Sequence, residues 1–370
     1  MVKSIIVYSL PIVLAYVFYF FVIEDPRMTL PSLSTLYPYL LLVTPYREEN
    51  RKAWLTHVPL NKNIIRPPQP VIEIQAKDYS YETIKAASRD FRIPVIVKGL
   101  FKDSVAVKEW KHGHRLNEFL GDFSIPVVRN AVVGTLQDHR EIVRFDEAYT
   151  QMLAQEKSKE YLFFPVKSRF TFNGSAAGRD QQLQEAVNKV CDADLNLDLI
   201  WPGFGKKQHS TFAGSQFVIG KSAPDFTNET TGSDWHCAIG NNWFILAAGK
   251  KKWDFVEPKY SHFMSPLKGG MFNMWTGNSQ RTASIIKHVP VWTTVMEEGD
   301  LIYNPDWMWH KVTNFGGLSI GVPIREKNLT ISARNNPYFT GIVFTNLFLA
   351  MFETSLGGFP PPSAATEQDN

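Results

Sequence analysis

The sequence has few cysteines and little excess charge. Its 370 residues contain only Cys191 and Cys237, too few for a disulfide framework, and the sequence leaves open whether these two pair. The net charge is +3 and no stripe of lysine and arginine is present, which argues against a nucleic-acid partner. No internal repeat is found. The composition, 44% hydrophobic and 13% aromatic, suits a packed core and argues against disorder.

The amino terminus carries a long apolar run without a charge. Ser4 to Ile23 is 20 residues long, and a helix of that length spans about 30 Å, the hydrocarbon thickness of a bilayer. Lys3 precedes the run and Glu24 and Asp25 follow it, which favours a cytosolic amino terminus. No small-residue cleavage site follows. We therefore expect a retained signal-anchor over residues 1–25 rather than a cleaved signal peptide.

This topology is type II, with the bulk of the chain in the lumen of the secretory pathway or outside the cell. Three sequons, at Asn173, Asn228 and Asn328, agree with that location and predict a glycoprotein. The membrane is thus the first expected partner, through the amino-terminal helix.

Composition divides the rest of the chain into three parts. Residues 26–77 are rich in proline and predict an extended stem, free or laid against the domain. Residues 78–337 form the expected folded domain. Residues 338–370 combine an apolar helix, Tyr338–Phe352, with a disordered tail. This helix is expected to pack on the domain; a homodimer contact and a membrane contact are the alternatives.

Short strands dominate the second half of the domain, after several helices in the first half. We expect helices at 80–91, 103–110, 115–120, 146–156 and 180–190, and strands at 93–99, 125–129, 141–145 and 162–166. Further strands are expected at 216–219, 234–238, 243–247, 252–256, 291–296, 301–303, 309–312 and 318–324, with a long loop over 259–287. Many short strands at close spacing predict a closed or sandwiched antiparallel sheet, such as a jelly roll.

Two histidines lie on separate strands of this second half. His236 lies in the strand 234–238, where residues 234, 236 and 238 project to one face. His310 lies in the strand 309–312. Neutral imidazole is the commonest metal ligand, so such a pair is able to hold a metal ion inside a barrel. Two ordinary hydrogen-bonded histidines are the alternative.

Four segments resemble the JmjC and related cupin-like oxygenases, which depend on Fe(II) and 2-oxoglutarate. Ile93–Gly99 resembles their PVVIRG strand, and Phe217–Gly220 resembles the strand before their metal motif. Trp235–Trp253 resembles their run of HxD, Asn-Phe and Gly-x-Lys-x-Trp, and Glu298–Val312 resembles their run that begins with Gly-Asp and ends in Trp-Trp-His-x-Val. The likeness covers Asp78–Arg325. It implies a double-stranded β-helix of α+β, mainly β class, with flanking helices.

The resemblance also implies roles for single residues. His236 and His310 match the two iron-binding histidines, and Lys251 matches the lysine that binds the distal carboxylate of 2-oxoglutarate. A cation is suited to a desolvated carboxylate. Ser233 matches an assisting hydroxyl and Asn242 a polar position beside the cosubstrate. A solvated charge in a hairpin turn is the alternative for Lys251.

The third iron ligand of the family, a carboxylate two residues after the first histidine, is replaced by Ala238. Four explanations stay open. The first is that iron chemistry has been lost on an intact fold, and the second is that a halide or water fills the position, as in related halogenases. The third is that Asp234, on the same strand face as His236, supplies the carboxylate. The fourth is that two histidines with 2-oxoglutarate and water suffice for weak binding.

The leading interpretation is a membrane-anchored oxygenase that hydroxylates protein or glycan side chains. A non-catalytic binding or interaction protein on the same fold is the alternative, and a halogenase-like enzyme is the third. Arg325, at the end of the matching region, contacts either a substrate or a surface acid.

Overall fold

The computed structural model describes residues 63–128, 140–165, 174–204, 213–222, 231–264, 267–268, 274–277, 279–326, 328–336 and 340. The signal-anchor expected at 1–25, most of the stem and the apolar carboxy-terminal helix lie outside these residues. Among the helices that are described, none is long and apolar enough to cross a membrane.

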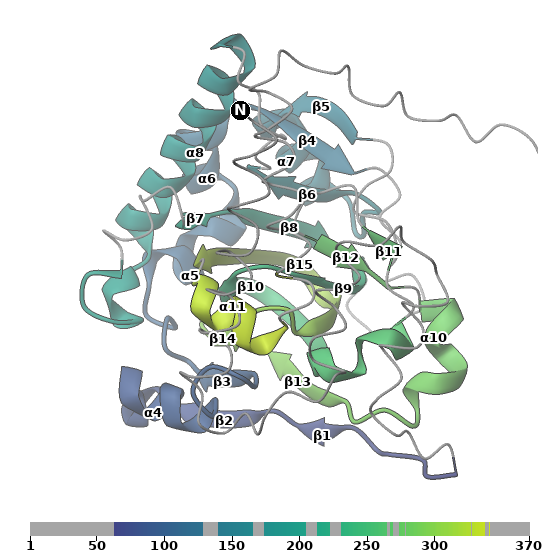
Figure 1. The fold of residues 1–370 in the computed structure, drawn as a ribbon. Helices are drawn as coiled ribbons and strands as arrows, with labels where there is room; N and C mark the ends of the chain where they lie inside the picture. Colours follow the sequence, from purple (N-terminus) through teal and green to yellow (C-terminus); the bar gives the residue numbers. More distant parts are fainter. Residues whose placement is uncertain are drawn as a thin grey trace, which may run out of the picture. The chain divides into compact units, whose positions relative to one another are not determined.

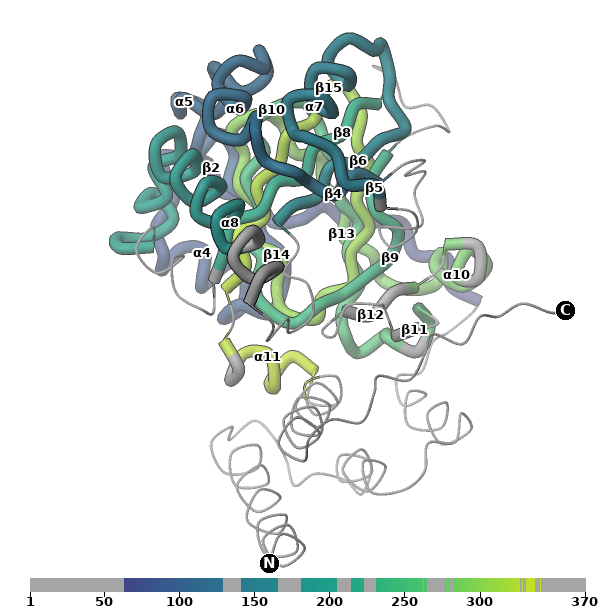
Figure 2. Tube along the Cα trace, turned by 90° about the horizontal axis from the view of Figure 1, so that it is seen from above, coloured from purple at the N-terminus to yellow at the C-terminus, as the bar shows by residue number. Residues whose placement is uncertain are grey.

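Two long antiparallel strands form the spine of the domain. They are β10 (Asn241–Val256) and β15 (Trp309–Glu326), which pair from Asn241 opposite Glu326 to Val256 opposite Trp309. On its other edge β10 pairs first with β14 (Leu301–Asn304) and then with β13 (Trp292–Met296). On its other edge β15 pairs with β9 (Gly232–Ala238), β8 (Phe217–Lys221) and β7 (Ala213–Ser215). Viewed from above, these strands curve around a common centre (Figure 2).

The sheet continues outward from both sides of this spine (Figure 1). Its main path runs β2-β3-β14-β10-β15-β8-β6-β4-β5. The outer strands are β2 (Ile72–Gln75), β3 (Val95–Lys98), β6 (Tyr161–Phe164), β4 (Ser124–Val128) and β5 (Arg140–Arg144). Off this path, β1 (Gln69–Pro70) pairs with β13, and β12 (Met274–Thr276) pairs with β9 and with β11 (Leu267–Lys268). Thus β1 and β2, from the end of the expected stem, are strands of the sheet.

Helices flank the sheet. They are α4 (Tyr81–Ala87), α5 (Val105–Glu109), α6 (His114–Leu120), α7 (Phe145–Ala154), α8 (Gly174–Asp194), α10 (Ser279–Ile286) and α11 (Leu329–Asn335). Ser80 begins α4 with a capping box, in which its side chain and that of Thr83 each accept a backbone N–H of the other residue. Neither cysteine forms a disulfide, and both are buried.

The alternation of side chains along the strands builds two cores. Trp243 and Ile245 of β10 face the helices and join a cluster that includes Trp110 and Val187. The alternate residues face the inside of the barrel, where a second cluster gathers Phe244, Leu246, Trp253, Phe255, Ile302 and Val312. The mainly β, jelly-roll class with flanking helices is therefore confirmed.

Two expected turns are bends within continuous strands. The sequence predicts separate strands at 243–247 and 252–256, yet β10 runs through both, with register shifts between Leu246 and Lys250. Gly249 adopts φ +79°, and a Cβ atom there would lie 2.2 Å from the carbonyl oxygen of Leu318. Only glycine fits this bulge, which lets one strand serve both halves of the barrel.

The strands expected at 309–312 and 318–324 are likewise both part of β15. The long loop expected over 259–287 is also a wrong prediction. It contains the 3-10 helix Pro258–Met264, the short strands β11 and β12, and α10. Short strands and an eight-residue helix leave too little periodicity for sequence patterns to detect.

Candidate functional site

The two histidines lie directly opposite each other inside the barrel. His236 of β9 is the register partner of His310 of β15. Their ring centroids are 4.0 Å apart, with an interplanar angle of 54°. Trp253 stacks on His310 at 5.5 Å, which fixes that ring against the inner core. The paired strands thus bring together the two residues that the sequence places 74 positions apart (310 − 236).

Each imidazole is oriented by a backbone carbonyl. Nδ1 of His236 lies 2.8 Å from the carbonyl oxygen of Asp234, and Nδ1 of His310 lies 2.8 Å from that of Met308. A carbonyl only accepts, so Nδ1 carries the proton and Nε2 keeps its lone pair. Asn304 Nδ2 also lies 3.3 Å from Nδ1 of His310, a longer contact. This is the arrangement that metal-binding histidines use.

Burial keeps both rings neutral. It lowers the pKa of His236 to about 4, and the positive charge of Arg325 acts in the same direction. Burial also lowers the pKa of His310 well below its usual value, with contributions from His236 and Arg325. Both rings are therefore neutral ligands at physiological pH, and Arg325 lies within electrostatic reach of both.

The described residues do not complete an iron site of the family's kind. Ala238, in the expected carboxylate position, has no donor atom, and its carbonyl oxygen accepts the backbone N–H of Trp307. Within the described ranges no three His, Cys, Asp or Glu residues gather closely enough to hold a metal ion. Two histidines alone leave the dication without negative charge, so these residues do not fit Fe(II) in its usual facial triad.

Asp234 does not substitute for the missing carboxylate. Its Oδ1 accepts the hydroxyl of Ser279, its Oδ2 accepts the Ser279 backbone N–H at 2.9 Å, and Lys311 lies 3.8 Å from Oδ1. Lys311 alternates with His310 on β15 and so faces outward. The carboxylate therefore binds the start of α10, outside the barrel.

A bulge in β9 explains why strand alternation gave the wrong face for Asp234. His236 pairs with His310 and Ser233 pairs with Val312, so three steps on β9 match two on β15. Ser233 consequently shares the inner face with His236, and Asp234 is turned away.

Lys251 is fully buried, with 0% of its surface exposed. Its Nζ donates to Oδ1 of Asn314 at 2.5 Å, and the rings of Phe244 and Tyr161 lie 5.7 and 6.0 Å away. Among the described residues it forms no salt bridge, and burial lowers its pKa to about 7. The alternative of a solvated hairpin charge is wrong, because the bulge at Gly249 directs Lys251 inward.

The partners of Lys251 form a polar chain that sequence patterns did not identify. Asn314, its register partner on β15, donates through Nδ2 to Oγ1 of Thr231 at 2.9 Å, and Thr231 Oγ1 lies 2.9 Å from Ser222 Oγ. Gly220 leaves room for them, since a Cβ there would lie 2.9 Å from Asn314 Nδ2. Only the register of β10 against β15 reveals this set.

Several buried polar atoms of the inner face lack a hydrogen-bond partner among the described residues. They are Asn242 Oδ1, Trp253 Nε1, Asn304 Oδ1 and Ser319 Oγ. Buried polar groups without partners are rare, and a bound ligand or water is one way to satisfy them. Asn242 lies on β10 opposite Arg325 of β15, and its place beside a cosubstrate stays a prediction.

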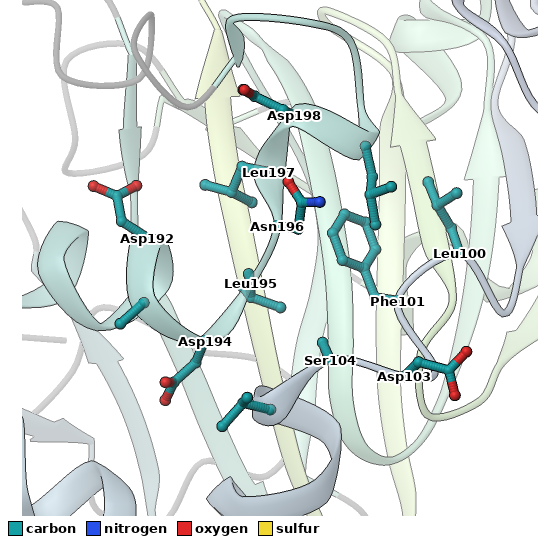
Figure 3. Close-up of a pocket in the computed structure, with 13 residues that line it drawn as sticks. Leu100, Phe101, Asp103, Ser104, Asp192, Asp194, Leu195, Asn196, Leu197 and Asp198 are labelled. Atoms are coloured by element: carbon teal, nitrogen blue, oxygen red, sulfur yellow. The ribbon is translucent and has the colours of Figure 1, made fainter.

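A pocket of about 650 Å³ lies away from the histidines, between the segment 100–105 that leads into α5 and the end of α8 with the residues that follow it (Figure 3). Its lining includes Phe101, Leu197 and four aspartates, of which Asp194 is bound by Arg115 at 2.8 Å and by Trp110 at 2.7 Å. None of the unpartnered buried polar atoms of the described chain lies in this lining. The barrel interior is therefore the better candidate site.

The missing ligand generates a direct prediction. We expect Ala238→Asp to raise the affinity for Mn(II), a probe for Fe(II), by about 100-fold or more, because loss of even an outer-shell partner costs 10–100-fold. Isothermal titration calorimetry of both proteins measures the change. Adding His310→Ala to Ala238→Asp should abolish the gain. Equal Mn(II) affinity of parent and Ala238→Asp would mean that position 238 does not face the histidines.

Residues 85–324 match the family of cupin-like domains, which is well over half of the 370-residue chain. A comparison with curated proteins gives no match. The matched segment begins within α4, ends two residues before the end of β15, and includes both histidines and Lys251. The chain therefore belongs to the cupin-like domain family, in its JmjC-like form.

Proposed function

We propose that the barrel of this protein binds 2-oxoglutarate or a close dicarboxylate, with Lys251 holding the distal carboxylate. The observation that carries the proposal is a lysine with 0% exposure and no salt bridge within the described residues. A buried charge without a counterion costs several kcal/mol, on the order of the penalty for breaking a buried ion pair. A bound carboxylate would remove that cost.

The neighbours of Lys251 support an anionic ligand of this kind. Asn314 orients the ammonium group and itself bonds to Thr231. Burial raises the pKa of Tyr161, so its phenol stays neutral and does not compete as a counterion. Ser233 and Asn242 are the further cosubstrate contacts that we propose, since both are buried and lie on strands next to the histidines.

Lys251→Met tests the proposal. Methionine is an unbranched apolar side chain of nearly the same length, and it removes both the charge and the hydrogen bond to Asn314, so the fold should be retained. We expect 2-oxoglutarate affinity to fall roughly 30-fold or more, because loss of one member of a desolvated charge pair costs about 2 kcal/mol or more. Calorimetry on the full-length protein measures it.

Lys250→Met is the matched control, since the Lys250 side chain is 49% exposed and pairs with Glu297 at the surface. Its 2-oxoglutarate affinity should equal that of the parent. If Lys251→Met binds as well as Lys250→Met, the proposed site is wrong.

A second candidate function is a 2-oxoglutarate-dependent hydroxylase of protein or glycan side chains. The observation in its favour is the pair of neutral histidines, each with Nε2 available for Fe(II). The observation against it is Ala238, which leaves a non-catalytic binding protein as the main alternative and a halogenase-like enzyme as another.

Succinate release separates these alternatives. For the hydroxylase, we expect the full-length protein with Fe(II) and 2-oxoglutarate to release succinate, and His310→Ala to return it to background. His112→Ala is the control, because that histidine is exposed. If neither the parent nor Ala238→Asp releases succinate, the protein is not a hydroxylase of this kind. Release that requires chloride would favour the halogenase-like enzyme.

We propose in addition that the chain is a type II membrane glycoprotein with this domain in the lumen or outside the cell. The support is the uncharged run 4–23, its basic leading flank and the three sequons. Asn328, one of the three, is exposed at the start of α11. A homodimer through the apolar segment 338–352 is part of the same proposal.

Glycosidase treatment tests the topology. We expect the full-length chain from secretory-pathway membranes to shift to lower mass, and Asn328→Gln to remove part of that shift. A chain without glycans, digested by protease added to the cytosolic side, would contradict the lumenal location.

A further inference from the structure

Arg325 faces the same chamber as the two histidines. On β15 it alternates with Ile324 and Val322, which point to the outer core. Gly321, on the inner side, is so close to Phe244 that an added Cβ would lie 2.1 Å from that ring. Arg325 follows Gly321 by four residues on the same face, opposite Asn242 of β10. Its charge acts on both His236 and His310.

No carboxylate of the described residues is bound to the guanidinium of Arg325. Within the described residues it makes no hydrogen bond or salt bridge, although its surroundings are desolvated enough to lower its pKa to about 10. It therefore stays charged at physiological pH. Its residue is partly exposed.

The carboxylate whose charge raises the pKa of Arg325 is Asp306; its Oδ1 has other partners, whereas its Oδ2 has no hydrogen bond among the described residues. Its Oδ1 accepts the backbone N–H of Gly240 and, at 2.9 Å, the hydroxyl of Ser332. Burial raises its pKa to about 7, so it neutralises Arg325 only in part. With Ala238 in place of an acidic ligand, the described interior carries two basic side chains, Lys251 and Arg325, and no described carboxylate is bonded to either.

Such a chamber favours an anion over a metal dication. A guanidinium close to the histidines repels a second positive charge, and the missing carboxylate removes the charge that would offset it. A guanidinium also binds a carboxylate through two parallel N–H donors, which a single ammonium group does not offer. The unpartnered atoms Asn242 Oδ1 and Asn304 Oδ1 are acceptors beside it, suited to a hydroxyl, an N–H or a water that accompanies the ligand.

We propose that Arg325 binds the second carboxylate of the dicarboxylate whose first carboxylate binds Lys251, so that the ligand is held at both ends without a metal ion. This inference rests on the proposed function, because it takes Lys251 as the first anchor. The ligand class is a short acyclic dicarboxylate with one carboxylate for each cation. Arg325 is then a specificity-determining residue, and the cupin interior serves as an anion-binding site.

The selectivity between succinate and butyrate tests the role of Arg325. These ligands have the same carbon chain and differ in the second carboxylate. In calorimetry on the full-length protein in EDTA, we expect 2-oxoglutarate and succinate to bind, and butyrate to bind at least about 10-fold more weakly, since a charged hydrogen-bonded pair is worth about 1.5 kcal/mol or more. Arg325→Gln should bring succinate to the affinity of butyrate.

Two further variants separate a binding role from a structural one. Arg325→Lys keeps the charge and should keep a preference for succinate, whereas loss of the fold would weaken both ligands together. Arg144→Gln removes an exposed arginine of β5 and should match the parent. If Arg325→Gln fails to fold, the ratio of succinate to butyrate affinity is compared between Arg325→Lys and the parent. A changed ratio supports the role of Arg325, and an unchanged ratio contradicts it.

The outcomes distinguish this inference from the proposed function. If 2-oxoglutarate binds only when Mn(II) is added, with Lys251→Met weakened and Arg325→Gln unchanged, Arg325 is not an anchor but the site at Lys251 stands. If no dicarboxylate binds with or without Mn(II), both proposals fail. Binding in EDTA that requires both Lys251 and Arg325 supports both.

Discussion

The burial of one ammonium group inside the β10–β15 pair is the constraint on which the site depends. Lys251 is held opposite Asn314 by strand register, and Asn314 is held in turn by Thr231. A lysine in such surroundings is expensive for a folded protein, because desolvation favours its neutral form. The polar chain behind Lys251 reduces that cost without supplying a negative charge. The interior is therefore electrostatically incomplete, and its remaining features, the neutral histidines and Arg325, are consistent with an anionic occupant.

Irregularities in two strands decide which side chains enter the interior. The bulge at Gly249 redirects β10 so that Lys251 faces inward, and the extra residue in β9 brings Ser233 onto the face of His236. The same extra residue sends the carboxylate of Asp234 outward to α10. A perfectly regular sheet with this sequence would present a different set of side chains to the chamber. The bulges are thus part of the binding site, although none of their backbone atoms needs to touch a ligand.

Much of the fold was accessible from the sequence. Periodicity predicted the jelly-roll class and the strands that carry His236 and His310. The order of the motifs predicted the position of Lys251, and the family match confirms the resemblance. Asp234 was misplaced because strict alternation does not anticipate a bulge. Asn314 was missed because only strand register shows that it lies opposite Lys251, 63 positions away (314 − 251). Contacts set by register are not encoded locally, and this is the physical reason that the histidine strands were predicted while their polar surroundings were not.

Ala238 has one further consequence, which concerns how this domain can change over time. The strand around it is held by main-chain hydrogen bonds, among them the bond from the Trp307 N–H to the Ala238 carbonyl, and these do not depend on which side chain stands at 238. These backbone hydrogen bonds would therefore persist with another side chain there. If the proposed function holds, a single substitution at this position would decide whether the barrel interior suits a metal ion or an anion. Architecture and reactivity are in this way able to evolve separately within one barrel.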